Sequence, residues 1–244
     1  MIGIWLVHQG RLCRTKNFEP DYFYTDAFLD TSAFDELMII DVTRNPNQSS
    51  GQFRDFVSRQ LATCFLPVTV GGGISTLRQA SELLDLGADR VVIGSGAYTK
   101  PDLVPKLVSQ LGSQAVVAGV DVRSSGQHDF ELPRWPGGDL GGRPDPRAWL
   151  NRVEEWGVGE VILNSWERDG SLRGLDLDSA DVLGDLITVP IVLVGGLGNW
   201  RQLASALQHP KVSGVGTSNI FHLTPESVAK AKQVLISESV PVRA

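Results

Sequence analysis

The chain has 244 residues, of which 42% are hydrophobic and 20% are charged, a composition typical of globular proteins and too apolar for a disordered one. Twenty-two basic and 28 acidic side chains leave a net charge of −6, which argues against a protein that coats nucleic acid. Two cysteines, Cys13 and Cys64, are too few for a disulfide scaffold or a cysteine-rich zinc module.

The apolar N-terminus, residues 1–7, lacks the basic lead-in and the small-residue cleavage site of a signal peptide. It predicts a first strand. No apolar run reaches the ~18 residues needed to span a bilayer. We therefore expect a cytoplasmic protein that has no membrane partner.

Short runs rich in Val, Ile and Leu alternate with longer amphipathic stretches along the whole chain. Runs that lack a two-residue alternation are typical of parallel strands buried on both faces. The eight expected strands are 2–7, 37–41, 67–70, 90–93, 115–121, 160–164, 191–194 and 212–216. The expected helices, with a spacing near 3.6, are 52–64, 76–86, 100–111, 146–156, 178–186, 200–208 and 225–238.

Eight strands that alternate with helices predict one (β/α)8 TIM barrel domain, an α/β fold, over residues 1–244. A doubly wound open sheet is the alternative, but it would usually have fewer strands and a single glycine-rich turn. Two connections are irregular. Residues 11–35 leave little room for a helix, and we expect a loop at 18–24. Residues 123–144 are rich in Gly and Pro, which predicts a long loop on the catalytic face.

An internal repeat divides the chain. Residues 67–79 resemble residues 190–202 at an offset of 123, residues 36–44 resemble 160–168 at an offset of 124, and the first strand aligns with the fifth at an offset of 115. The pairs related by the offset of 123 include Gly72 with Gly195, Gly73 with Gly196, and Ser95 with Ser218. The repeat predicts two duplicated half-barrels, about 1–114 and 115–244.

The paired glycines follow the third and seventh expected strands. Because no Cβ blocks the approach, backbone N–H groups can face a ligand there, and the following helix N-terminus adds partial positive charge. We expect two phosphate sites on opposite sides of one mouth and a bisphosphorylated substrate that spans it. Tight packing of strand against helix is the alternative explanation of the same glycines.

Candidate acid–base groups lie at the ends of the expected strands. Asp121 ends the fifth strand and is well placed as a general acid or base. Asp41 ends the second strand and Asp169 follows the sixth, where a solvated loop or a helix cap is the alternative role. Trp166 also follows the sixth strand and is placed to narrow the site. The four histidines lack metal-ligand spacing, so we expect no metal and no cofactor.

Several motifs together resemble the cyclase subunit of imidazole glycerol phosphate synthase. They occupy residues 70–74, 111–114, 120–123, 164–170 and 220–222, and the resemblance extends from Ile2 to about Leu235. It implies a barrel of duplicated halves that forms a heterodimer with a glutaminase on its N-terminal face. Ammonia from glutamine would cross the barrel to a bisphosphate substrate, in lyase and cyclase chemistry of histidine biosynthesis.

The resemblance also assigns residues. It makes Asp121 the family's second catalytic aspartate, and it places phosphate binding at Gly72, Gly73, Ser95, Gly195, Gly196 and Ser218. Three charged residues of the ammonia entrance correspond to Glu36, Arg90 and Glu160, and Asp89 corresponds to a position that faces the glutaminase. Because such charges are costly to bury unpaired, we expect a paired ring around a passage. An ordinary salt-bridge cluster is the alternative.

Four departures distinguish the chain from that family. Leu6 stands where the family has its first catalytic aspartate, and Arg14 replaces a loop lysine. The family's fourth entrance residue has no counterpart, since the sequence begins inside the first expected strand, and the first helix is shortened. Leucine cannot transfer a proton, so ring closure should fall by at least ~10²-fold.

The departures favour a divergent paralogue. Residues 10–15 and 162–165 are similar to a branch without the strand-one aspartate, the barrel partners of surface-polysaccharide amidotransfer systems. We expect an ammonia-conducting subunit with a glutaminase partner. The alternatives are an active cyclase in which His8 or Asp41 replaces the missing acid, an isomerase of the same fold, and a scaffold that binds a phosphorylated metabolite.

Overall fold

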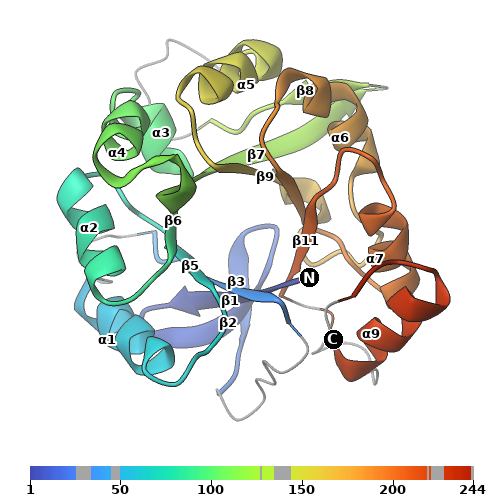
Figure 1. The fold of residues 1–244 in the computed structure, drawn as a ribbon, viewed down its shortest axis with the longest axis horizontal. Helices are drawn as coiled ribbons and strands as arrows, with labels where there is room; N and C mark the ends of the chain where they lie inside the picture. Colours follow the sequence, from blue (N-terminus) through green and yellow to red (C-terminus); the bar gives the residue numbers. More distant parts are fainter. Residues whose placement is uncertain are drawn as a thin grey trace.

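The computed structural model describes residues 1–25, 34–44, 50–126, 128–134, 144–218, 220 and 228–242. Eight parallel strands close into a barrel, and helices surround it (Figure 1). Around the barrel the strands are β1 (Ile2–His8), β4 (Glu36–Asp41), β5 (Val68–Gly71), β6 (Arg90–Ile93), β7 (Val116–Gly126), β9 (Glu160–Ser165), β10 (Ile191–Val194) and β11 (Gly214–Thr217). Pairing of Ile2 with Gly216 joins β1 to β11, which confirms the (β/α)8 barrel.

The outer layer consists of helices that connect successive strands. They are α1 (Ser50–Leu61), α2 (Leu77–Asp85), α3 (Ser95–Thr99), α4 (Leu103–Leu111), α5 (Pro146–Glu155), α6 (Leu177–Leu183), α7 (Trp200–Leu207) and α9 (Val228–Ser237). Short 3-10 helices cover Ser113–Ala115, Trp166–Arg168 and Gly184–Leu186. Within the described ranges, none of these helices combines the length and apolarity that crossing a membrane requires.

Helix starts follow local capping rules. The Thr76 side chain accepts a hydrogen bond from the Gln79 backbone N–H and begins α2. Asn199 and Gln202 form a reciprocal capping box at the start of α7. These two helices follow the two glycine turns, so each turn leads into a capped helix N-terminus. The half-barrel duplication itself stays a prediction from the sequence.

Side chains on each strand alternate between the barrel interior and the helix layer, as the pleat requires. The interior cluster is apolar and contains Ile2, Ile4, Leu6, Met38, Ile40, Val92, Val117, Ile162, Val192 and Val194. The alternate positions pack under the helices, among them Trp5, Val7, Leu37, Ile39, Val91, Val161 and Leu193. Both faces of each strand are therefore buried, which explains why the strands are apolar runs in the sequence.

The connection after β1 differs from the expected loop. Residues 18–24 are mostly strand, because β2 (Arg11–Lys16) and β3 (Glu19–Phe23) form an antiparallel hairpin beside β1. Asn17 and Phe18, with φ of 52° and 64°, make the tight turn. The loop prediction was wrong because Asn17 supports a two-residue turn, and this turn lets the residues on either side of it pair as strands.

The connection after β7 also begins as a hairpin. β7 runs on to Gly126 and pairs with β8 (Asp129–Glu131). The rest of the expected long loop, 135–143, lies outside the described residues. Phe221 and His222 of the motif at 220–222, and the expected helical start at 225–227, also lie outside them.

Candidate functional site

The two glycine turns lie at one end of the barrel. Gly72 follows β5 and Gly195 follows β10, and these strands are four positions apart in the ring of eight. Ser95 follows β6, the neighbour of β5, and Ser218 follows β11, the neighbour of β10. The turns therefore face each other across one mouth, each with a serine on the adjacent strand end, as the sequence predicted.

Packing explains three of the four glycines. A Cβ on Gly72 would lie 2.2 Å from the Asp41 carbonyl oxygen, and Cβ atoms on Gly195 and Gly196 would lie 2.5 and 2.4 Å from the carbonyl oxygens of Ser165 and Gly174. All three also have positive φ. Strand packing, the alternative explanation, therefore operates at these positions.

Gly73 is different, because a Cβ there would meet nothing within 4 Å. Its φ of 66° still favours glycine. At this turn the backbone borders open space where a ligand could approach.

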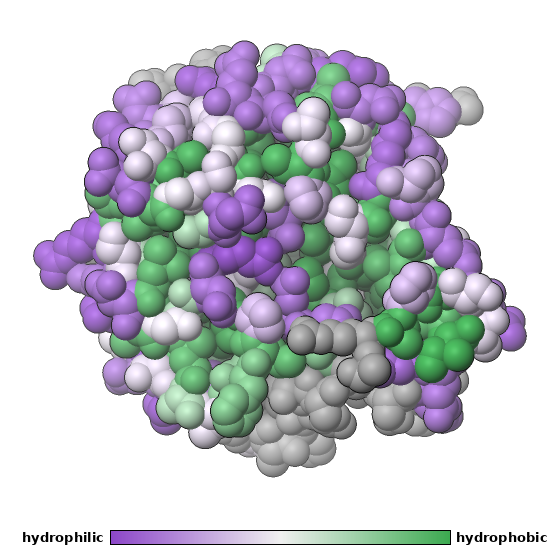
Figure 2. Space-filling view, viewed as in Figure 1, coloured by the Kyte–Doolittle hydropathy of each residue, from purple (hydrophilic) through white to green (hydrophobic). Residues whose placement is uncertain are grey.

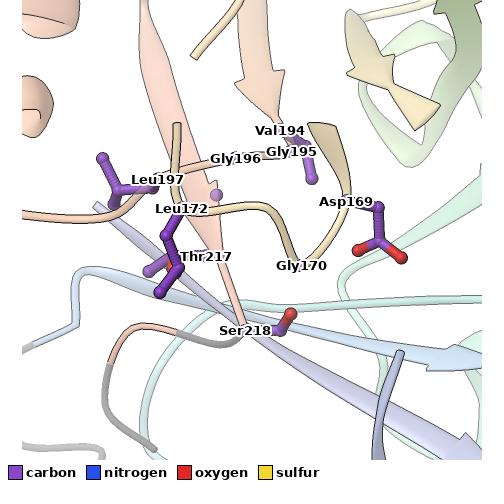
Figure 3. Close-up of a pocket in the computed structure, with 10 residues that line it drawn as sticks. Asp169, Gly170, Leu172, Val194, Gly195, Gly196, Leu197, Thr217 and Ser218 are labelled. Atoms are coloured by element: carbon purple, nitrogen blue, oxygen red, sulfur yellow. The ribbon is translucent and has the colours of Figure 1, made fainter. Parts of the chain in front are cut away.

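A pocket lies beside the second turn (Figure 3). It is lined by Asp169, Gly170, Leu172, Val194, Gly195, Gly196, Leu197, Gly216, Thr217 and Ser218. None of these lining residues is Lys or Arg, so an anion bound here would depend on backbone N–H groups and on the hydroxyls of Thr217 and Ser218. Asp169 places a carboxylate at the edge of the same pocket.

Asp121 lies in the middle of β7, close to where its pairing with β9 ends, and its pairing partner on β9 is Asn164. The Asn164 side-chain amide donates a hydrogen bond of 2.8 Å to Asp121 Oδ1. Burial raises the pKa of Asp121 to about 6, the Asn164 bond opposes this rise, and the charge of Asp169 adds to it. A carboxyl with that pKa exchanges protons near neutrality, as a general acid or base must.

Leu6 occupies the opposite side of the mouth. It pairs with Ile40 and packs with Ile40 and Val194 in the interior cluster. Strand β1 is four positions from β7 in the ring, so an apolar side chain faces Asp121 across the mouth. Asp121 therefore has no second carboxylate at the equivalent position across the ring.

Arg14 is held within the β2–β3 hairpin. Its guanidinium donates to Asp21 through Nε at 3.1 Å and Nη2 at 2.9 Å. It also lies 5.7 Å from the centre of the Tyr22 ring. These contacts fix the guanidinium to its own hairpin.

Of the alternative acids, Asp41 accepts a hydrogen bond of 2.8 Å from the Thr43 backbone N–H. His8 ends β1, and its ring centre lies 6.0 Å from that of Phe23. The Nδ1 atom of His8 is buried with no hydrogen-bond partner among the described residues. Nor do the described residues bring together three His, Cys, Asp or Glu side chains as a metal site would require.

At the other end of the barrel, the strand starts bring three charged side chains together. Arg90 Nη1 donates to Glu160 Oε2 at 3.1 Å, and Nη2 forms a second ion pair with Glu36. In the view down the barrel, hydrophilic side chains gather over its centre (Figure 2). Burial raises the pKa of Glu160, while Arg90 opposes that rise. Glu160 Oε1 is buried without a hydrogen-bond partner in the described part of the chain.

Asp89 lies beside this group and is exposed. Its Oδ2 accepts a hydrogen bond of 2.7 Å from the Val68 backbone N–H, which holds the start of β5. The assignment of Asp89 to a partner interface stays a prediction.

Sequence reasoning missed the contacts of the β2–β3 hairpin with the loop after β9. The Trp166 ring lies 6.4 Å from that of Phe18 at the hairpin tip, and 5.4 Å from the Arg123 guanidinium carbon. Asp169 accepts hydrogen bonds from the same hairpin. The one available signal was Asn17, a residue that favours tight turns.

The family model for "Histidine biosynthesis protein" matches residues 6–225. The match covers most of the chain and includes both glycine turns, Asp121 and the charged group at the opposite end of the barrel. The chain therefore belongs to the histidine biosynthesis protein family.

Proposed function

We propose that this chain is the synthase-type barrel subunit of a glutamine amidotransferase complex. A glutaminase docks as a heterodimer partner at the end that carries Glu36, Arg90 and Glu160. Ammonia crosses the barrel to a phosphorylated substrate or a downstream enzyme at the mouth. The chain is a divergent paralogue with weak cyclase activity.

The observation that carries the proposal is the position of Arg90 between two carboxylates at the strand starts. One cation shared by two acids can release one carboxylate while it still holds the other, a property suited to an entrance that opens. An ordinary salt-bridge cluster needs no passage behind it. Here the inward positions behind the charges are apolar and buried. A passage that opened between them would favour neutral ammonia over ammonium, because desolvating an ion is costly.

The mouth supports the remainder of the proposal. Two facing turns suit a ligand with two phosphates, with Gly72, Gly73 and Ser95 on one side. Gly195, Gly196 and Ser218 lie on the other. Leu6 opposite Asp121 removes one of two proton-transferring groups, so binding is retained while ring closure is weakened.

The test measures glutamine hydrolysis by the glutaminase encoded beside this chain. We expect the purified chain to raise the rate of glutamate release, and Arg90→Ala to reduce that stimulation. Arg78→Ala is the matched control, since Arg78 lies on α2 and pairs with Glu82. The proposal fails if no neighbouring glutaminase is stimulated.

One observation favours the second candidate, an active cyclase of histidine biosynthesis. The pKa of Asp121, about 6, suits acid–base work even without a partner aspartate. Growth of a cyclase-deficient histidine auxotroph carrying this chain would support that activity. Absence of growth, with normal stimulation of the glutaminase, would favour the paralogue.

A further inference from the structure

The loop between α1 and β5 presents an aromatic side chain to solvent. Phe65 is 100% exposed, which makes it the most exposed large apolar side chain of the described residues. Single apolar side chains are ordinary on a protein surface, but most of them cover part of their area against a neighbour. The Phe65 ring buries no area in its own chain, so it contributes nothing to the apolar core of the barrel.

The backbone that carries Phe65 is held on both sides. Before it, the Cys64 N–H donates a hydrogen bond of 3.0 Å to the Gln60 carbonyl oxygen at the end of α1. After it, the Pro67 carbonyl oxygen accepts a hydrogen bond of 2.9 Å from the Leu37 N–H on β4. The ring therefore projects from a fixed loop, and little backbone entropy is lost when a partner buries it.

The repeat in the sequence supplies a comparison within the chain. The offset of 123 that relates Pro67 to Pro190 also relates Phe65 to Thr188. Thr188 is exposed as well, but its backbone N–H donates to the Glu154 carboxylate at 3.2 Å, and its hydroxyl bonds to the same carboxylate. A small polar residue with partners in its own chain is therefore sufficient before a barrel strand, and the fold does not require an aromatic residue there.

Phe65 borders the charged group at the strand starts. Its loop leads into β5, and the neighbours of β5 in the ring are β4 and β6, which begin with Glu36 and Arg90. Two exposed carboxylates, Asp85 and Asp89, precede β6, and Asp89 is hydrogen-bonded to the first residue of β5. Neither forms an ion pair with a Lys or Arg of the described residues. The surface around Phe65 thus combines an exposed ring with acidic groups, and its complement is an apolar surface with basic groups.

We propose that Phe65 is the apolar anchor of the glutaminase interface: its ring enters an apolar pocket of the partner, and basic side chains at the rim of that pocket face Asp85 and Asp89. The inference rests on the proposed function and deepens it by naming the chemistry of the partner surface. Aromatic anchors within a polar rim are common in protein interfaces. Full burial of a phenyl ring is worth a factor of about 10 to 100 in affinity.

Calorimetry measures binding of the full chain to the glutaminase encoded beside it, and glutamate release is followed over a range of chain concentrations. Phe65→Thr should raise the dissociation constant about 20-fold, because the buried ring is lost. Maximal stimulation should stay unchanged, since Phe65 lies outside the Arg90 group. The chain concentration at half-maximal stimulation should rise by the same factor as the dissociation constant. Arg90→Ala should instead lower the maximum.

Three further variants separate the anchor from a general effect. Phe65→Leu keeps most of the apolar area and should weaken binding only about threefold. Asp85→Lys should also weaken binding, by a factor that shrinks as salt screens the rim charges. Tyr22→Thr removes an exposed ring from the β2–β3 hairpin and should leave the dissociation constant unchanged. Thermal unfolding of Phe65→Thr should match that of the wild type, because the ring buries no area in the folded chain.

Equal dissociation constants for the wild type and Phe65→Thr, with stimulation by the wild type intact, would overturn the anchor and leave the proposed function standing. Lower maximal stimulation at unchanged affinity would also overturn it, because Phe65 would then act in activation and not in docking. A dimer of the chain alone that Phe65→Thr dissociates, measured by analytical ultracentrifugation, would assign the ring to a second copy instead. If the wild type binds no neighbouring glutaminase, the proposed function fails and the anchor fails with it.

Discussion

The two ends of the barrel differ in the partners of their charged side chains. At the strand starts, Arg90 forms ion pairs with both Glu36 and Glu160. At the mouth, the described partner of the Asp121 side chain is the neutral amide of Asn164, and the apolar Leu6 lies across the ring from it. The strand-start acids share a cation, whereas burial raises the pKa of Asp121 to about 6, so its protonation can change near neutrality. Under the proposed function, entry belongs to the first end and chemistry or delivery to the second.

Arg90→Ala should have the largest effect, because it leaves two carboxylates without their cation. We expect a loss of about 3 kcal/mol in the free energy of unfolding at pH 7, at the low end for breaking a buried ion pair since the group is partly exposed. Urea denaturation measures it. Arg90→Ala with unchanged stability would mean that the two ends do not differ as described.

Leu6→Asp tests whether the apolar side chain opposite Asp121 weakens proton transfer. We expect cyclase turnover with ammonia to rise by about 10²-fold, because a second proton-transferring group is restored. Leu6→Asn is the control, since asparagine has a shape similar to that of aspartate but cannot exchange a proton. Equal activity of the two variants would contradict the assigned role of Leu6.

Asp121→Asn tests the buried carboxyl at the mouth through the pH dependence of the free energy of unfolding. In the folded chain the pKa of Asp121 is raised from 3.8 to about 6, so the folded state holds its proton more tightly than the unfolded state. The wild type therefore loses stability as pH rises from about 4 to about 6. The variant should lack this loss and gain about 3 kcal/mol relative to the wild type at pH 7. Urea titrations at pH 4 and pH 7 measure the difference, and a constant difference would contradict it.

Asp89→Ala should have the smallest effect. It removes the hydrogen bond to the Val68 N–H, which is worth about 1 kcal/mol in unfolding free energy. Asp89→Asn keeps an acceptor and should lose less. If both variants are stable but weaken glutaminase stimulation, Asp89 acts at the interface in addition to holding β5.

Much of the fold was predictable because barrel strands are short and buried on both faces. The strands β6 and β10 were predicted at their observed ends, since their apolar runs stop at charged or turn residues. The hairpin at 11–23 was not predicted, because its residues are mostly polar and the strand with which it pairs is the end of β1. The hairpin pairs with β1, and this pairing leaves no periodic hydrophobic pattern in the hairpin's own residues.

The candidate site also has features that the sequence predicted and features that it did not. Repeated glycines and strand-end carboxylates identified the mouth, because position at the end of a parallel strand is a local property. The contact of Asp169 with Thr15 and Phe18 joins residues more than 150 positions apart, and no local pattern encodes it.

The sequence by itself determined the succession of strands and helices, the two glycine turns and the apolar Leu6 in the first strand, because each depends on residue type and near neighbours. Only the tertiary structure decided that Arg90 pairs with both acids, that burial raises the pKa of Asp121, and that Asp169 joins the β2–β3 hairpin to the loop after β9. Those features depend on burial and on distances between distant segments, which exist only once the barrel has closed.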